Sequence, residues 1–242
     1  SNRIWQHHFG DGIVRTSTNF GLRGERPTHP ELLDYLARRF IESGWSTKAL
    51  HRLILLSAIY QQGSDGTPAS LAADPENKLW GRMNRRRLDA ESIRDTLLSV
   101  AGRLDTSRGG AGFQDVAVPR RSLYLMSVRT GTKSGFASIF DSPDSGGIVE
   151  KRSVSTVPQQ ALFLLNDPFA GEMAATLAKS LAADAPASAP AGRIYALYRR
   201  LFGRAPTAEE LAIGDDLLQG PDPAEALKRY CQLLFCANEF VY

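Results

Sequence analysis

Apolar side chains recur at three- and four-residue intervals along most of the chain, a spacing typical of amphipathic helices. The clearest segments are 32–40, 50–58 and 93–104. Residues that begin helices stand before all three, namely Thr28 with Glu31, Ser46 and Asp89. The sequence therefore predicts a chain built mainly from helices that each bury one face.

The densest apolar segment is 153–169, where a polar approach leads into a nearly continuous apolar run. Pro158 suits a first helical position, because its missing N–H would have no partner there. Asn166 breaks this helix, and Asp167 with Pro168 begins another. We expect the first of these helices to be buried on nearly every side and to lie at the centre of the core.

Two further segments complete the predicted fold. Asp74 followed by Pro75 should begin another helix. The range 122–129 offers the one convincing strand, with a partner near 114–118 or 153–157. We therefore predict a mainly α fold, an irregular multi-helix bundle with at most a small two-stranded β-ribbon.

The best internal boundary is an Ala-, Pro- and Ser-rich stretch near residue 188. It predicts a main helical domain over 1–183, a linker over 184–192 and a small helical unit over 193–242 packed on the main domain. Capping signals at Thr207 with Glu210 and at Asp222 support helices in the last part.

Composition and targeting signals narrow the class of protein. Of the 242 residues, 43% are hydrophobic and 23% are charged, as in ordinary globular proteins. No run approaches the roughly 18 apolar residues of a membrane span, and no signal peptide is recognisable at the start. Because the chain begins without methionine and goes straight into a dense motif, we expect a domain of a longer protein.

The net charge of +3 is unevenly distributed. Residues 205–242 hold seven acids and two bases, which leaves an excess of positive charge in the rest. The densest basic cluster is Arg82, Arg85, Arg86 and Arg87, followed by Arg94. Such a cluster suffices for a phosphate or sulfate but is sparse for a nucleic-acid track, so nucleic acid is an unlikely partner.

The two helices predicted over 32–40 and 50–58 could be read as a DNA-binding helix-turn-helix. However, the second is too apolar to read bases, since 53–56 is an unbroken aliphatic run. A helical hairpin packed in the core fits this pattern better.

Metal and haem signals are absent or incomplete. Three histidines, His7, His8 and His29, could be considered as metal ligands, but their spacing matches no known ligand pattern, and structural histidines are the preferred interpretation. Gly131-Thr132-Lys133-Ser134 lacks the glycines of a phosphate-binding loop. There is no Cys-x-x-Cys-His sequence either, so covalent haem on this chain is excluded.

Two groups of polar residues are candidates for a functional site. Asp141 and Asp144 could form a catalytic carboxylate pair, although their Ser, Pro and Gly neighbours favour turn-forming aspartates. The other group consists of hydrogen-bonding residues beside the apolar segment, namely Arg121, Arg152, Gln159, Gln160 and Asn166. Arginines next to these acids could form either an anion site or a buried ion-pair network.

Several long motifs resemble one known family. They are Asn-Arg-Ile-Trp-Gln-His-His-Phe-Gly at 2–10, the ranges 28–34, 44–46, 50–54 and 84–88, the apolar segment at 153–169, and Asn-Glu-Phe at 238–240. Together they resemble planctomycete-specific domain one, a domain of unknown function, over nearly the whole chain.

The resemblance implies a setting rather than a reaction. Such domains form the C-terminal part of large exported proteins, often with an upstream cytochrome c-like domain, so any haem would belong upstream and this chain would carry no cofactor. We expect a non-catalytic module that binds upstream domains of the same polypeptide or a saccharide or anionic small ligand. The alternative is an enzyme acting on extracellular polysaccharide through acid–base carboxylates.

Overall fold

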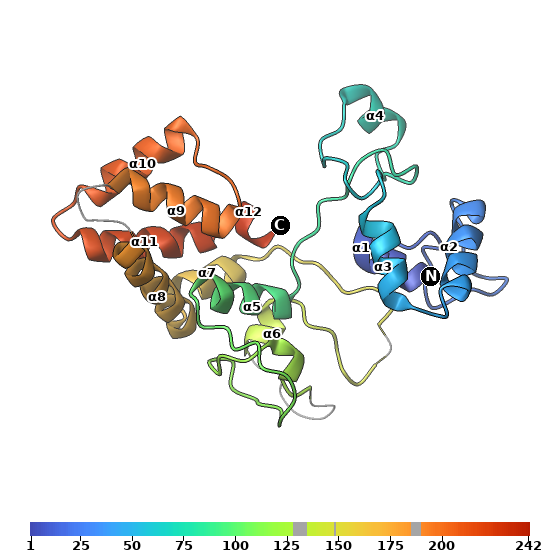
Figure 1. Cartoon of the computed structure of the whole chain (residues 1–242), viewed down its shortest axis with the longest axis horizontal. Coiled ribbons are helices and arrows are strands. Elements are labelled where there is room, and N and C mark those ends of the chain that lie inside the picture. Colours follow the sequence, from blue (N-terminus) through green and yellow to red (C-terminus); the bar gives the residue numbers. More distant parts are fainter. Residues whose placement is uncertain (128–134, 148, 185–189) are drawn as a thin grey trace. The chain divides into compact units, whose positions relative to one another are not determined.

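The computed structural model describes residues 1–127, 135–147, 149–184 and 190–242. Within these ranges the chain forms twelve α-helices, one short 3-10 helix and no strand (Figure 1). Two isolated bridges, Asp105 with Arg120 and Phe113 with Leu125, are the only β-type pairings among the described residues. The predicted mainly α fold is therefore confirmed. None of the described helices has both the length and the apolar character needed to cross a bilayer.

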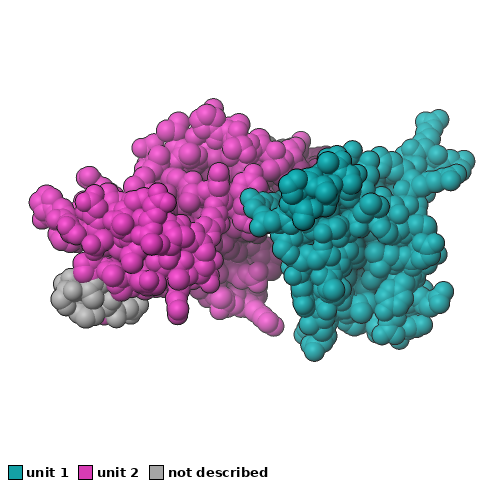
Figure 2. Space-filling view, turned by 90° about the horizontal axis from the view of Figure 1, so that it is seen from above, with its two compact units in different colours: residues 1–86 teal, residues 87–242 magenta. Residues whose placement is uncertain are grey.

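The chain divides into two compact units, residues 1–86 and 87–242 (Figure 2). The division predicted around 184–192 stays a prediction, and residues 185–189 of that linker lie outside the described part of the chain.

The first unit contains α1 (Asn2–Phe9), α2 (Pro30–Glu42), α3 (Thr47–Leu55) and α4 (Pro68–Ala73). Its core is aromatic, with Trp5 stacked on Phe9 at 4.2 Å between ring centroids and Trp80 set edge-on against both. The helical hairpin α2–α3 contributes Leu36, Leu50 and Ile54 to this core. Ser46 caps α3 by accepting the N–H of Ala49, as predicted.

Two predicted helix starts in the first unit are wrong. The Thr28 hydroxyl donates to the carbonyl of Ile13 instead of capping α2, and His29 takes the N-cap position. The carboxylate of Asp74 accepts the N–H groups of Lys78 and Leu79, which closes a loop where a helix was expected. A short-range rule failed at each position because the side chain found another backbone partner.

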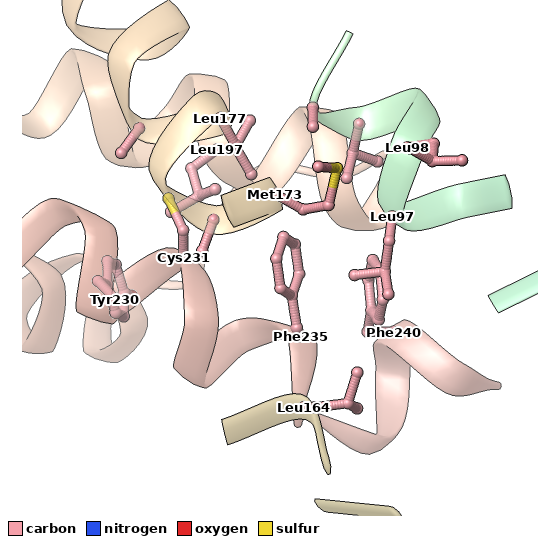
Figure 3. Packing of buried hydrophobic residues seen from close by; sticks show 14 of the residues in the cluster. Leu97, Leu98, Leu164, Met173, Leu177, Leu197, Tyr230, Cys231, Phe235 and Phe240 are labelled. Carbon is pink, nitrogen blue, oxygen red and sulfur yellow. The ribbon is translucent and has the colours of Figure 1, made fainter. Parts of the chain in front are cut away.

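The second unit begins with α5 (Ala90–Val100), η1 (Ser122–Tyr124), α6 (Gly135–Ile139) and α7 (Pro158–Asn166). It continues with α8 (Pro168–Asp184), α9 (Pro190–Phe202), α10 (Ala208–Leu218), α11 (Pro223–Phe235) and α12 (Asn238–Val241). Its core joins α5, α7, α8, α9, α11 and α12 through fully buried side chains such as Leu97, Leu177 and Phe235 (Figure 3). Asp89, Thr207 and Asp222 cap their helices as predicted.

Helix α7 is less buried than its sequence suggested. Leu164 is buried, but Leu162 is 54% and Leu165 40% exposed. The prediction that this helix is buried on nearly every side is therefore wrong. The reason is that α7 packs mainly on α8 and α11, with Phe163 against Phe136 of α6, and Leu162 and Leu165 lie on the side away from these contacts.

The strand predicted over 122–129 does not form within the described residues. Ser122–Tyr124 is a 3-10 helix, and the backbone then pairs only locally: Phe113 donates to Tyr124 and Met126 donates to Phe113. Residues 128 and 129 lie outside the described ranges. The pairing partner is Phe113, close to the predicted range 114–118, but it amounts to a single bridge.

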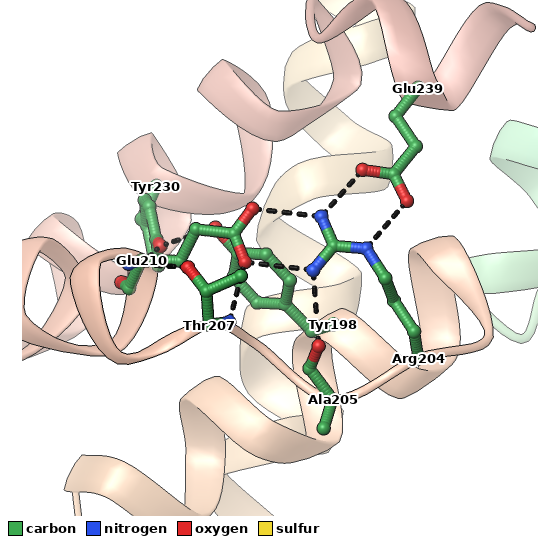
Figure 4. Close-up of polar contacts among 7 residues, drawn as sticks. All are labelled: Tyr198, Arg204, Ala205, Thr207, Glu210, Tyr230 and Glu239. Carbon is green, nitrogen blue, oxygen red and sulfur yellow. Dashed lines mark hydrogen bonds and ion pairs between the residues drawn. The ribbon is translucent and has the colours of Figure 1, made fainter. Parts of the chain in front are cut away.

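An arginine clamp fixes the end of the second unit (Figure 4). The Arg204 guanidinium makes paired hydrogen bonds to Glu210 at 2.8 and 2.8 Å and to Glu239 at 2.7 and 2.6 Å. Glu210 also accepts the N–H of Thr207, which completes the capping box of α10. Because each carboxylate meets the planar guanidinium through two bonds, the geometry is specific as well as strong.

Because of this clamp, we expect the folded protein to lose stability in acid. The hydrogen bonds from Arg204 lower the pKa of Glu210 from 4.5 to about 2. A carboxyl whose folded pKa is depressed stabilises the fold above its unfolded pKa and loses that contribution as pH falls. Near pH 6 we expect the free energy of unfolding of wild type to be about 1–2 kcal/mol larger than that of Glu210→Gln, after allowance for solvent screening. This difference should shrink between about pH 5 and pH 2.

Urea unfolding at a series of pH values measures this difference. Glu209→Gln is the matched control, because Glu209 lies next to Glu210 in sequence and, among the described residues, has no ion-pair partner. A pH-independent gap between wild type and Glu210→Gln would contradict the prediction.

Candidate functional site

An open hollow of about 700 Å³ runs along α5 in the second unit. The predicted ligand residues Arg121 and Arg152 both line it. The remaining polar lining comes mostly from α5 and its N-cap, namely Asp89, Glu91, Ser92, Asp95, Thr96 and Ser99. The hollow is thus the place where the structure brings two of the predicted site residues together.

Helix α5 supplies a row of hydroxyl groups to this hollow. Ser92, Thr96 and Ser99 are four and three residues apart, which places them on one face of the helix. The opposite face carries Ile93 and Leu97, which are fully buried. Among the described residues, none of the three hydroxyls has a hydrogen-bond partner in the protein.

Arg94 holds the segment that forms the far wall of the hollow. Its side chain is fully buried, and its guanidinium donates to the backbone carbonyls of Val116, Val118 and Arg120. The same group donates to the Ser122 hydroxyl at 3.1 Å. Burial lowers the pKa of Arg94, and the neighbouring carboxylate of Asp95 opposes this effect. This cation therefore works as a cross-link between α5 and residues 116–122.

Asp95 and Arg121 continue the same wall. The Asp95 carboxylate accepts the N–H of Ser122 at 2.8 Å and lies 3.3 Å from Arg94. Arg121 approaches Asp95 at 3.9 Å and remains half exposed at the rim. The 3-10 helix is consequently pinned to α5, and Arg121 is presented to the hollow.

Arg152 closes the other side by pairing with α5. Its guanidinium donates to both oxygens of Glu91, at 2.6 and 3.2 Å, and lies 3.7 Å from Asp89. The hydrogen bond with Glu91 raises the pKa of Arg152 further above its ordinary value. Asp89 meanwhile caps α5 through the N–H of Ser92. The charged groups around the hollow are therefore largely paired with one another.

The three other predicted ligand residues do not line the hollow. Gln160 is buried and donates to the carbonyl of Ile139 at 2.9 Å. Asn166 is exposed and donates to the carbonyl of Leu162 within its own helix. Gln159 is exposed on α7. Of these three polar residues, Gln160 therefore bonds inside the core, whereas Gln159 and Asn166 lie on the outer surface.

The candidate catalytic carboxylates have structural partners. Asp141, which adopts a positive φ of 59°, accepts the N–H and the hydroxyl of Ser155 and lies 3.5 Å from Arg87. Asp144 accepts the N–H of Gly146 in a turn. Neither lines the hollow. Their geometry is that of turn and loop anchors rather than an acid–base pair.

The arginine cluster seen in the sequence is used inside the protein. Each side chain donates to groups of its own unit: Arg82 to Asp74 and Pro75, Arg85 to Ser64 and Asp65, Arg86 to His7, Arg87 to Ser155, and Arg94 to the wall of the hollow. The cluster is also divided between the two units. Each of these guanidiniums therefore has a hydrogen-bond partner within its own unit.

The histidines considered as metal ligands do not converge. His8 bonds His51 at 2.7 Å, His29 bonds Thr28 at 3.1 Å, and His7 is exposed. Burial, and then the charges of His51, Arg86 and His7, lower the pKa of His8. The described residues contain no group of three or more His, Cys, Asp or Glu side chains that could hold a metal ion. Lys133 and its neighbours at 131–134 lie outside the described ranges.

Sequence reasoning missed the part that α5 plays. Ser92, Thr96 and Ser99 recur with helical period opposite an apolar stripe, and this pattern was available as a signal. Arg94 was missed because it stands near the arginine cluster in the sequence, although it falls on the apolar stripe of α5. A charged residue within a buried stripe is itself an indication of an internal cross-link.

Fold and hollow together define an all-α domain with an open polar hollow in which the charges are paired. Comparison with protein families matches residues 1–218 to PSD1, described as a protein of unknown function (DUF1553). The chain belongs to this family, which confirms the resemblance found in the sequence. Comparisons with curated proteins and with solved structures gave no significant match.

Proposed function

We propose that this domain is a non-catalytic binding module that holds a neutral, hydroxyl-rich ligand, such as a saccharide, in the hollow along α5. The observation that carries the proposal is the row of three hydroxyls between two arginines, and none of these hydroxyls has a hydrogen-bond partner in the part of the chain that the structure describes. Hydroxyl groups both donate and accept, so they suit the hydroxyls of a sugar.

The charges of the hollow favour a neutral ligand over an anionic one. Three carboxylates and two guanidiniums line it. Arg152 is engaged by Glu91, and Arg121 faces Asp95. An anion would have to compete with these carboxylates, whereas a neutral ligand can bond to their remaining lone pairs.

The same pairing supports a binding role over an enzymatic one. Asp89 caps a helix, Glu91 holds Arg152, and Asp95 accepts a backbone N–H. A general acid or base needs a carboxyl within reach of the substrate proton, and these groups already hold the walls together. No feature of Asp141 or Asp144 favours the alternative of a polysaccharide-degrading enzyme. The family resemblance supports an exported, cytochrome c-associated protein as the setting, with upstream domains as further partners.

A thermal-shift series tests the proposal. Neutral oligosaccharides at a hundredfold excess over their dissociation constant should stabilise the chain by about 2.7 kcal/mol, a rise of roughly 5–10 °C for this length. Ser99→Trp should abolish the rise, because the indole would fill the hollow from an exposed position on α5. Ala182→Trp, on the exposed side of α8, is the matched control and should retain it.

Sulfated oligosaccharides, tested in the same series, show whether the hollow binds anions instead. If only they raise the melting temperature, and Ser99→Trp abolishes the rise, the hollow is an anion site and the neutral-ligand proposal is wrong. If a ligand stabilises wild type and Ser99→Trp equally, it binds elsewhere.

A further inference from the structure

A shallow apolar groove of about 430 Å³ lies between α2 and α3 in the first unit. Leu53 and Leu56 line it, and Leu56 is 63% exposed. These residues belong to the aliphatic run 53–56, which we expected to pack in the core. Ile54 does so, but the end of the run is open to solvent. Exposed leucines at the edge of a groove indicate a surface that another element can cover.

The rim of this groove carries unpaired positive charge. Arg39 is paired with Glu42 at 3.2 Å. Arg52 lines the groove and Lys48 lies one turn earlier on α3, and within the described part of the chain neither has an ion-pair partner. A segment that fits this groove should therefore combine apolar side chains with acidic ones.

The exposed face of α10 in the second unit has this composition. Ile213, 52% exposed, and Leu217, 41% exposed, are four residues apart and project from one face. Glu209 and Asp216 flank them, and neither has an ion-pair partner among the described residues. The face thus presents two apolar side chains between two carboxylates.

The packing of α10 keeps this face outward. Gly214 and Leu218 are buried on the opposite side of the helix. A Cβ added at Gly214 would lie 2.9 Å from Ile194 and 3.0 Å from Tyr230, so α10 sits against its neighbours with no room for a side chain there. The capping box at Thr207 and the Arg204 clamp fix the start of the helix.

From these surfaces we propose that the chain associates head to tail with a second copy of itself, the outer face of α10 docking in the α2–α3 groove. Ile213 and Leu217 would cover Leu53 and Leu56, with the carboxylates beside Arg52 and Lys48. Total charge favours the same pairing. Residues 1–86 hold twelve Lys and Arg against eight Asp and Glu, whereas 205–242 hold two against seven. Because the two surfaces differ, each copy can bind one neighbour on each side.

Sedimentation velocity over a range of protein concentrations tests this proposal with two variants. Leu56→Glu places a negative charge at the edge of the α2–α3 groove, and Ile213→Lys places a positive charge on the outer face of α10. Each change should disrupt one of the two proposed contact surfaces. Each should weaken self-association at least about tenfold, as expected for central apolar contacts. Both positions are exposed, so the fold should be kept, and circular dichroism checks this. Leu22→Glu and Leu233→Glu alter exposed leucines elsewhere and should leave association unchanged.

Mixing the two variants gives the decisive result. Leu56→Glu retains an intact α10, and Ile213→Lys retains an intact groove, so an equimolar mixture should form a dimer and nothing larger. Added salt should weaken the association, because the charged rims contribute. A wild-type chain that stays monomeric at all concentrations, or an association that neither variant weakens, overturns the proposal. Failure of the mixture to dimerise overturns the head-to-tail arrangement.

Discussion

Replacing Phe235 with alanine should lower the free energy of unfolding of the second unit by about 3–5 kcal/mol. The ring is fully buried and lies 5.1 Å from the ring of Phe240, in the core that joins α7, α8 and α11 (Figure 3). Removing it leaves a cavity in a region where several helices meet, so the lost contacts cannot be restored by a small movement of one of them.

Leu233→Ala is the matched control on the same helix. Leu233 is 51% exposed, so its truncation should change stability by less than about 0.5 kcal/mol. Urea titration followed by circular dichroism measures both values. Equal losses at the two positions would mean that α11 does not bury the face described above.

Replacing Arg94 with alanine should have a comparable effect, also about 3–5 kcal/mol. The change removes a buried cation and leaves the carbonyls of Val116 and Arg120 and the Ser122 hydroxyl without their donor. Segment 113–122 should then detach from α5, so amide hydrogen exchange should accelerate there before it does in the rest of the unit. Arg94→Lys, which keeps the charge but has fewer and differently placed donors, should fall between wild type and alanine.

The control for Arg94 is an arginine that pairs at the surface. Arg103 bonds Glu172 at 2.8 Å with both side chains well exposed, so Arg103→Ala should cost less than about 1 kcal/mol. If Arg94→Ala lost stability without faster exchange over 113–122, Arg94 would contribute to packing but would not anchor the wall of the hollow.

Helix existence and several helix starts could be predicted because the causes are local. The side chains of Ser46, Asp89 and Thr207 each accept an N–H three residues further on, and such contacts depend only on neighbouring sequence. Thr28 followed the same rule in sequence but found a partner fifteen residues away, at Ile13. Capping rules therefore fail where tertiary structure offers the side chain another acceptor.

Burial was harder to predict than helicity. The apolar run in α7 indicated complete burial, but the number of helices that pack against a segment is a property of the whole fold. Leu162 and Leu165 are exposed for that reason. For the site, Arg121 and Arg152 were predicted together with Gln159, Gln160 and Asn166, and only the two arginines line the hollow. Arg94, which was not predicted, anchors the wall of the hollow through contacts that span more than twenty residues.

The junction between the two units has a consequence for dissecting the chain. Arg86 donates to the carbonyl of His7 in the first unit, and the next residue, Arg87, donates to the carbonyl of Ser155 in the second. The two adjacent guanidiniums thus bond to different units. If the coding sequence is divided between these two codons, each arginine stays in the same unit as the carbonyl that it bonds. The junction of residues 86 and 87 is accordingly the natural place to divide the coding sequence when either unit is to be produced alone.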